Sequence, residues 1–307
     1  MFLHLVRSSP RAFGIERTRW RLEDLREACP WLQLTHAGSL SRLLCRLKIS
    51  YKRAREHVHS PDPDYLPKLK YVFDLLQAAG ESGGKVVVTF LDELTYYRQP
   101  SPAPAYERQG KDQPPARRSH GANTATRVIA AVDALTGRVT FWQGSKTGLP
   151  QIAGFYKALR EAHAGAERIY VAQDNWPIHF HPDVLCALEE QERPFPFRPC
   201  PHWSTEPSAK AVKKWGEGRL PVQIVPLPTY APWTNPIEKL WRWGKQEVLH
   251  LHPWADQVKK LREQFSGFLT RFEKGSKELL RYIGLADPLA LYSSAWEHLP
   301  RAPASPY

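Results

Sequence analysis

The chain has 307 residues and carries 43 lysines and arginines against 31 aspartates and glutamates, a formal charge of +12. This length suffices for one large domain or two domains with buried cores, and the basic excess favours a polyanionic partner such as nucleic acid. Four widely spaced cysteines exclude a zinc module of paired cysteines and a disulfide framework, and they favour a reducing, cytosolic setting. No apolar run approaches about 18 residues, so we expect neither a membrane span nor a signal peptide.

Two short helices are predicted near the start of the chain. Residues 16–28 mix charges with apolar and aromatic positions in the pattern of an amphipathic helix, which Pro30 would end. A second helix is expected from Ser39, a suitable N-cap, to about residue 49, with one leucine-rich face. Two helices joined by a turn are compatible with helix-turn-helix geometry, in which the second helix enters a major groove.

Basic residues dominate the second of these helices and the segment after it. Between residues 41 and 55 no residue is acidic, and the basic ones are Arg42, Arg46, Lys48, Lys52, Arg53 and Arg55. Neutralisation of DNA phosphates is the natural use of such a face. An ordinary solvated helix pair remains the alternative, because basic runs are often only solvated.

A boundary between two domains is predicted near residue 80. Prolines interrupt residues 58–65 and indicate a hinge, and a helix over residues 66–80 then ends in a glycine-rich turn. We therefore expect a helix-turn-helix-like DNA-binding region with a linker helix over residues 1–80, and a larger domain over residues 81–307.

The second domain has the element order of a mixed α/β sheet. Residues 85–93 form a continuous apolar run, which predicts a strand buried on both faces with Asp92 at its end. The further expected elements are a β-hairpin at 126–144, a helix at 150–163, a strand at 167–175, a helix at 181–191, a strand at 221–228 and a helix at 236–250. An antiparallel start followed by parallel strands with crossover helices is the order of a ribonuclease-H-like sheet flanked by helices.

The last predicted helix has a clear start signal. Thr234 and Asn235 can cap a helix whose first position is Pro236, because proline has no N–H to lose there. Glu238 then lies in the first turn, shortly after a strand. A lone glutamate at this position usually only complements the helix dipole, so its role depends on its neighbours.

Three carboxylates occupy related positions in this order of elements. Asp92 and Asp174 lie at predicted strand ends, and Glu238 lies in a first helical turn after a strand. Because sites form where the strand ends of an open α/β sheet gather, we expect the three to meet. Converging acids repel one another unless a cation offsets their charge. Mg²⁺ or Mn²⁺ is the expected occupant, and two such ions can act together on a phosphodiester.

Three segments resemble a known family. FLDELTYYRQP, AQDNWPIHFHP and LPTYAPWTNPIEKLW, which contain the three acids, resemble the acidic motifs of DDE transposases of the Tc/mariner superfamily, in its bacterial insertion-sequence branch. The third is the most specific, and its matching residues are Pro228, Tyr230, Pro232, Asn235, Pro236, Ile237, Glu238 and Trp241. Residues 39–65 also resemble the end of the winged helix-turn-helix that precedes this catalytic domain.

The resemblance implies a DNA transposase whose catalytic, metal-binding residues are Asp92, Asp174 and Glu238. It implies hydrolysis that frees a transposon end, after which the 3′-hydroxyl attacks target DNA without a covalent enzyme intermediate. The implied partners are the double-stranded DNA of the transposon ends and the target and, in the synaptic complex, a second copy of the chain. The implied setting is the bacterial cytoplasm, at the nucleoid when the protein is bound to DNA.

Two features depart from the family pattern. The gap between Asp174 and Glu238 contains a Pro/Trp/Lys-rich insert at residues 194–220, and the N-terminal region has room for one helix-turn-helix where relatives often carry two. We expect the insert to be a flap over DNA, with lysines that meet phosphates and tryptophans that meet bases. These residues are Lys210, Lys213, Lys214, Trp203 and Trp215.

Polar neighbours are expected to support the site. Glu93 beside Asp92 could assist a metal ion, but strand alternation should point its side chain the other way. Asn175, His179 and Asn235 are expected to hold the loops of the site, since histidine is a poor ligand for magnesium. Two alternatives to an active transposase remain: a domesticated, catalytically inactive DNA-binding descendant, and a scaffold that needs no metal.

Overall fold

The structure, a computed structural model, describes residues 2–51, 60–197, 199–216 and 218–288. The chain divides into two compact units, residues 1–57 and 58–307. Three residues of the predicted basic face, Lys52, Arg53 and Arg55, lie outside the described residues. Within the described ranges, no helix combines the length and the apolar character needed to cross a membrane.

The first unit is helical, as predicted. Its elements are α1 (Phe2–Arg7), a 3₁₀ helix (Pro10–Phe13), α2 (Leu22–Glu27), a 3₁₀ helix (Pro30–Leu32) and α3 (Ala37–Arg46). Leu25 of α2, Leu40 of α3 and Cys29 between these helices are buried and form a small core. None of residues 2–51 lies in a strand, so this described stretch contains no wing.

Helix α2 begins later than the sequence pattern predicted. Residues 16–21 are not helical, and the indole of Trp20 in this stretch donates a hydrogen bond to the Ser8 carbonyl (2.9 Å). The Asp24 carboxylate accepts the backbone N–H of Arg21 (3.1 Å) and so caps the helix at this point. A tertiary contact and a local cap together set the start of α2.

Helix α3 presents its basic face to solvent. Arg42, Arg46 and Lys48 are exposed, whereas Leu40 is buried. The helix ends at Arg46 rather than near residue 49. Lys48 adopts a φ of 56°, in the left-handed region through which a right-handed helix cannot continue. The exposed basic side chains of α3 remain candidates for contact with DNA.

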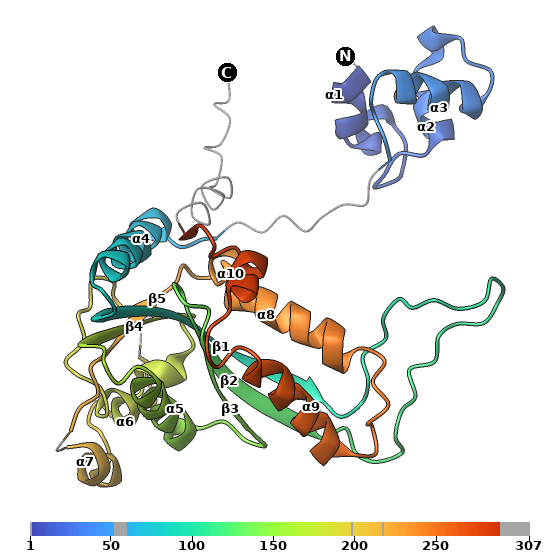
Figure 1. Ribbon diagram of the computed structural model, residues 1–307. Coiled ribbons are helices and arrows are strands. Elements are labelled where there is room, and N and C mark those ends of the chain that lie inside the picture. Colours follow the sequence, from blue (N-terminus) through green and yellow to red (C-terminus); the bar gives the residue numbers. More distant parts are fainter. Residues whose placement is uncertain (1, 52–59, 198, 217, 289–307) are drawn as a thin grey trace. The chain divides into compact units, whose positions relative to one another are not determined.

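A five-stranded sheet forms the centre of the second unit (Figure 1). In chain order its strands are β1 (Val86–Tyr97), β2 (Ala125–Asp133), β3 (Val139–Gly144), β4 (Arg168–Gln173) and β5 (Val222–Pro226). They lie in the order β3-β2-β1-β4-β5, with β1–β2 and β2–β3 antiparallel and β1–β4 and β4–β5 parallel. The predicted mixed sheet is confirmed.

Helices cover both faces of this sheet (Figure 1). One face packs against α4 (Tyr65–Glu81), α8 (Ile237–Gly244), α9 (Val258–Thr270) and α10 (Lys277–Ile283). The other face packs against α5 (Leu149–Ala162), α6 (Pro182–Leu185) and α7 (Ala209–Trp215). Short 3₁₀ helices occupy Pro177–Phe180 and Pro232–Thr234, and a π-helical turn, Lys245–Leu249, extends α8.

Strand β1 separates two layers of the hydrophobic core. Val88 and Phe90 belong to the layer under α4 and α8, whereas Leu91 belongs to the layer under α5. This alternation follows from the two-residue repeat of a β-strand. The next two side chains, Asp92 and Glu93, accordingly face opposite sides of the sheet.

Helix α4 belongs to the second unit, although the sequence placed the domain boundary near residue 80. Its apolar side chains, including Leu69, Val72 and Leu76, pack into the same core layer as the sheet. The division between the units falls between residues 57 and 58. Burial of this helix face against the sheet accounts for the difference.

The predicted helix over residues 181–191 is wrong beyond its first turn. Helix α6 ends at Leu185, and the chain then turns toward β5. Leu188 forms a β-bridge with Leu220, and the side chain of Gln191 makes hydrogen bonds to the backbone of β5. Beyond residue 250, where the sequence predicted no element, α9 and α10 complete one face of the unit.

The insert at residues 194–220 is docked on the second unit. The Asp183 carboxylate accepts hydrogen bonds from the backbone N–H (2.6 Å) and the hydroxyl (2.8 Å) of Ser208, which precedes α7. Trp215 of α7 is buried in the core layer under the sheet, so the expected contact of this side chain with bases is wrong. The three lysines of the insert are exposed: Lys210, Lys213 and Lys214.

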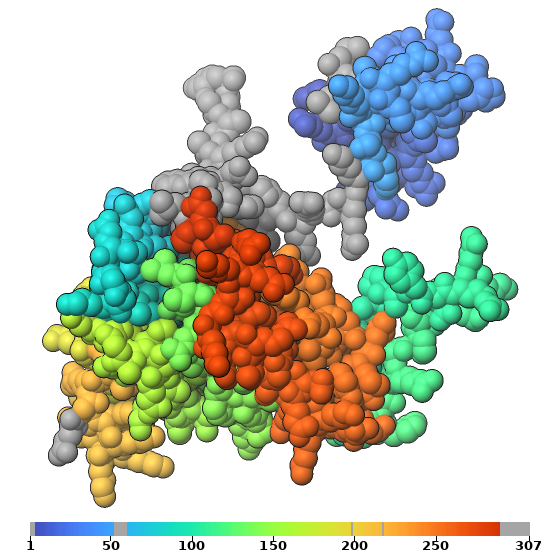
Figure 2. All heavy atoms as spheres, in the orientation of Figure 1, coloured from blue at the N-terminus to red at the C-terminus, as the bar shows by residue number. Residues whose placement is uncertain are grey.

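Residues 98–124, between β1 and β2, form an arm that projects from the second unit (Figures 1 and 2). Arg98 fixes the base of the arm, because its guanidinium donates hydrogen bonds to the Ala255 carbonyl (2.8 Å) and the Ser119 hydroxyl (3.3 Å). The arm exposes four basic side chains: Arg108, Lys111, Arg117 and Arg118.

Candidate active site

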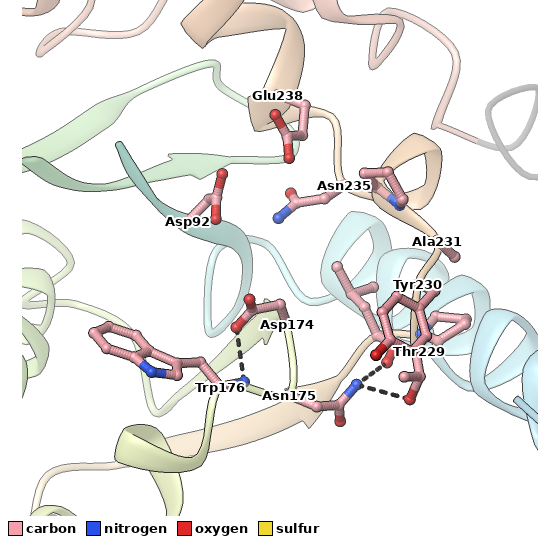
Figure 3. Close-up of a pocket in the computed structure, with 12 residues that line it drawn as sticks. Asp92, Asp174, Asn175, Trp176, Thr229, Tyr230, Ala231, Asn235 and Glu238 are labelled. Atoms are coloured by element: carbon pink, nitrogen blue, oxygen red, sulfur yellow. Dashed lines mark hydrogen bonds between the residues drawn. The ribbon is translucent and has the colours of Figure 1, made fainter. Parts of the chain in front are cut away.

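The three acidic residues singled out in the sequence line one pocket (Figure 3). Asp92, Asp174 and Glu238 face a space of about 410 Å³. The other lining residues follow β4 or precede α8: Asn175, Trp176, Leu227, Pro228, Thr229, Tyr230, Ala231, Pro232 and Asn235. The lysines of α7 are not among the residues that line it. The fold thus brings together three acids from distant parts of the chain.

Asp92 lies within β1 rather than at its end, so the predicted strand end is wrong for this residue. The strand continues because β2 remains paired along it. The parallel pairing of β1 with β4, however, stops at Phe90 opposite Ala172. Asp92 and Asp174, the first residue after β4, therefore both lie at the carboxyl end of this ladder. Glu238 reaches the same place from the first turn of α8.

The Asp92 carboxyl is in an environment that disfavours its charge. Burial, followed by the neighbouring carboxylates of Glu238 and Glu93, raises the pKa of Asp92 to about 8. The indole N–H of Trp241 donates to Asp92 Oδ2 (2.8 Å) and partly opposes this rise in pKa. Without a cation, the group is mostly protonated at neutral pH.

Glu238 shares this environment. Burial raises its pKa above the ordinary range, and the charge of Asp174 acts in the same direction. Lys245 and Arg242, which lie on the same helical segment, act in the opposite direction. The acids of the pocket thus interact electrostatically, as expected for carboxylates that share one site.

Two asparagines link the segments that carry the acids. Asn235 donates from its side-chain amide to the Leu91 carbonyl (3.0 Å) and so ties the start of α8 to β1. Asn175 donates to the Leu227 carbonyl (2.7 Å) and ties the segment after β4 to the one after β5. Both contacts agree with the expected supporting role, which remains a prediction.

The residues of the pocket fit a hard divalent cation. Three carboxylates supply the oxygen ligands that Mg²⁺ and Mn²⁺ prefer. Burial of the Asp92 carboxyl and the nearby carboxylates of Glu238 and Glu93 raise its pKa, and a bound cation would offset both effects. In addition, Asn235 Oδ1 is buried and has no hydrogen-bond partner among the described residues, and its amide points into the same space (Figure 3).

The contact between Trp241 and Asp92 is a feature that sequence reasoning missed. The sequence places Trp241 among the matching residues of the third acidic motif but does not indicate its contact with Asp92. The side chain is buried (2% exposed), and a buried indole N–H needs an acceptor. The acidic residues of the three motifs could have indicated that such an acceptor lies close to Trp241.

Trp241→Phe should weaken Mn²⁺ binding at pH 7 by about 10- to 100-fold, because loss of the indole donor removes a charge-assisted hydrogen bond worth roughly 1.5–3 kcal/mol to the ionised form of Asp92. Titration calorimetry with Mn²⁺ measures this change. Trp243→Phe is the matched control, since Trp243 packs against Phe268, Phe272 and Tyr282 away from the acids. Equal loss in both variants would mean that the effect is one of packing.

A mixed sheet with three carboxylates at one edge defines a nuclease-like domain of the ribonuclease-H type. Residues 87–262, more than half of the chain, match the family described as DDE superfamily endonuclease. The chain belongs to this family, and the expected DDE domain is confirmed.

Among curated proteins the chain is similar to an uncharacterised 39 kDa protein of insertion element IS630 from Shigella sonnei, with 22% identity over 242 residues. The match covers 78% of this chain and 60% of that protein, so the chain spans less than two thirds of the relative's length.

Solved structures of a mariner transposase share the fold. The Mos1 mariner paired-end complex with Mn aligns with a TM-score of 0.56 and 14% identity, over 96% of this chain and 79% of that chain. The Mos1 strand transfer complex aligns with a TM-score of 0.51 and 15% identity, over 96% and 78% of the two chains. The predicted ribonuclease-H-like fold class is confirmed.

Proposed function

We propose that this protein is a DNA transposase that cuts transposon ends and joins them to target DNA. One observation carries this proposal above the others: the pocket that holds Asp92, Asp174 and Glu238 in a DDE family member. The similarity in fold to the mariner structure with Mn, and the insertion-element origin of the curated relative, support it.

The three carboxylates would hold two divalent ions, Mg²⁺ or Mn²⁺, which when bound activate the attacking oxygen and stabilise the leaving oxygen of a phosphodiester. Asp92 supplies one oxygen to this site while the Trp241 indole fixes the other. Asp174 is the exposed member and lies nearest to solvent. Asn235 keeps the first turn of α8 in register with β1, which sets Glu238 opposite Asp92.

The proposed reaction has two displacements at phosphorus. In the first, a water oxygen forms a bond to phosphorus, the bond from phosphorus to the 3′-oxygen of the transposon end breaks, and this oxygen takes up a proton. In the second, the oxygen of this 3′-hydroxyl forms a bond to a target phosphorus and loses its proton, the bond from that phosphorus to the target 3′-oxygen breaks, and the released oxygen takes up a proton. No bond to the protein forms in either step.

The DNA-binding surface of the first unit extends beyond the predicted helix face. A second, polar pocket of about 270 Å³ is lined by Arg11, Glu16, Arg17, Thr18, Arg19 and Arg21. Four guanidinium groups around one space suit phosphate oxygens. We include these arginines, which sequence reasoning missed, with Arg42, Arg46 and Lys48 as phosphate contacts. Lys210, Lys213 and Lys214 are proposed as further contacts on the second unit.

A nicking assay tests the proposed function. Duplex DNA that carries the terminal repeats of the protein's own insertion element should be nicked at the repeat ends in Mg²⁺ or Mn²⁺ and left intact when EDTA removes the ion. Affinity for duplex DNA should fall steeply with salt, as phosphate contacts require. Binding without nicking under any divalent ion would instead identify the domesticated DNA-binding descendant, and nicking that survives EDTA would contradict the metal mechanism.

The resemblance to the family implies that two copies of the chain act together on the two transposon ends. We propose that a homodimer holds the two ends and that the protein acts on DNA in the bacterial cytoplasm. Crosslinking on end-containing DNA, compared with DNA that lacks the ends, measures the number of copies in the assembly.

A further inference from the structure

Glu93 faces a buried histidine on the side of β1 opposite to Asp92. Its Oε1 lies 3.1 Å from Nε2 of His179, whose side chain is 0% exposed. Despite this short distance, neither atom has a hydrogen-bond partner among the described residues. Buried polar atoms almost always have a hydrogen-bond partner, so this nitrogen and this oxygen require an explanation such as a bound ion.

The other nitrogen of the imidazole is already engaged. His179 Nδ1 lies 3.1 Å from the Tyr156 hydroxyl, which is 2.8 Å from Gln173 Oε1 in a wholly buried chain. Gln173 is the last residue of β4 and immediately precedes Asp174. These hydrogen-bonded side chains hold the imidazole ring of His179 in one orientation, with Nε2 directed at Glu93. A metal-binding histidine characteristically has its second nitrogen held in this way.

Asp174 completes a set of three ligand atoms. One ligand atom each from Glu93, Asp174 and His179 lies within 4.8 Å of the other two. Around a divalent ion with bonds of about 2.1 Å, neighbouring ligand atoms are roughly 3 to 4 Å apart. The separation of 3.1 Å between Glu93 Oε1 and His179 Nε2 falls in this range. The third ligand comes from an exposed residue, which gives an ion access from the pocket.

We propose that Glu93, Asp174 and His179 form a binding site for a divalent transition-metal ion of the Mn²⁺ or Zn²⁺ type, distinct from the set formed by Asp92, Asp174 and Glu238. An imidazole ligand suits these ions and disfavours Mg²⁺. The inference deepens the proposed function because Asp174 belongs to both sets, so an ion at the His179 site would restrain a carboxylate of the catalytic pocket. It also extends the role of His179 beyond support of the loop.

Pulsed electron paramagnetic resonance of bound Mn²⁺ tests this site directly, because a coordinated imidazole adds ¹⁴N modulation that a site of carboxylates alone lacks. The full chain loaded with Mn²⁺ should show this modulation, and His179→Gln should remove it. His252→Gln is the matched control, since His252 is also buried (3% exposed) and its Nε2 also has no hydrogen-bond partner, yet no described carboxylate completes a metal-binding group with it. The control should retain the signal.

Two further variants keep the test independent of folding and of catalysis. Glu93→Gln leaves the histidine and its buried chain in place and should weaken the nitrogen-coordinated Mn²⁺ by at least about tenfold. Asp92→Asn combined with Glu238→Gln removes two acids of the catalytic set and should keep the ¹⁴N modulation. A wild-type protein without ¹⁴N modulation at saturating Mn²⁺, or a signal that survives His179→Gln, would overturn the proposal. Failure of the nicking assay would leave this result unaffected.

Discussion

Asp174→Asn and Glu238→Gln should each lower metal-dependent nicking by at least about 1,000-fold, because each removes a charge that holds a divalent ion while preserving the size of the side chain. The two residues approach the pocket from β4 and α8, so neither can replace the other. Rates of nicking under single-turnover conditions, with Mg²⁺ in excess, measure the loss. Binding to duplex DNA should stay within about twofold of the wild type, since these variants alter no proposed phosphate contact.

Glu247→Gln serves as the matched control for these variants. Glu247 lies in the π-helical turn that extends α8, but it forms an exposed ion pair with Arg271 and does not line the pocket. Its nicking rate should equal that of the wild type. Full activity of Glu238→Gln would contradict the assignment of Glu238 as a metal ligand.

Asp92→Asn should abolish nicking as well and should also change how stability depends on pH. The pKa of Asp92 is about 8 in the metal-free fold, against an ordinary value near 3.9 in the unfolded chain. Because the folded state binds the proton more tightly, this group's stabilisation is complete below about pH 4 and is lost as the pH rises through 8. The melting temperature of the metal-free wild type should therefore fall over this window, and that of Asp92→Asn should fall less. Divalent ions should restore stability at pH 8 only when Asp92 is present.

Asp62→Ala should destabilise the second unit by about 3–5 kcal/mol, because it leaves the ammonium of Lys68 buried without its counter-charge. Lys68 Nζ lies 2.8 Å from Asp62 Oδ2, and the two side chains are only 7% and 4% exposed. The same carboxylate accepts the backbone N–H groups of Thr229 (2.8 Å) and Asp64 (2.9 Å). The loss therefore also loosens Thr229, which lines the catalytic pocket.

Urea unfolding followed by tryptophan fluorescence measures this change in stability. Asp74→Ala removes the exposed ion pair of Lys70 and Asp74 on the same helix and should cost less than about 1 kcal/mol. Adding Lys68→Met to Asp62→Ala should recover part of the loss, since an apolar side chain then replaces the uncompensated charge. A loss in Asp62→Ala as small as in Asp74→Ala would show that the pair is effectively solvated.

The buried pair also shows how residues 60–64, the described part of the predicted hinge before α4, are held. These residues are not helical, as the prolines in the sequence indicated. However, Ser60 donates to the Thr229 carbonyl (2.6 Å), and Asp62 bonds to the Thr229 amide, so residues 60–62 are attached to the loop before α8. Such contacts join residues far apart in the chain, and local composition does not encode them.

The sequence by itself determined the types of the strands and the central helices of the second unit and the three acids of the pocket. The spacing of apolar residues, with a period of two in a strand and 3.6 in a helix, follows from local backbone geometry and can be read directly from the sequence. The Asn-Pro-Ile-Glu start of α8 is likewise a local signal, because Pro236 has a helical backbone conformation at the N-cap of the helix. The hydrogen bond from Asn235 to the Leu91 carbonyl, in contrast, is a long-range contact that the motif does not indicate.

Only the tertiary structure decided which groups meet. Pairing with β2 carries β1 past Asp92, and the β1–β4 ladder ends two residues before Asp92 and Asp174, which both line the pocket. Trp215 packs into the core of the second unit, next to the hydrogen bond of Ser208 with Asp183, although the composition of the insert suggested a flap over DNA. The contacts of Trp241 with Asp92 and of His179 with Glu93 arise between segments distant in the chain. Such contacts depend on the three-dimensional packing of side chains, for which sequence periodicity carries no information.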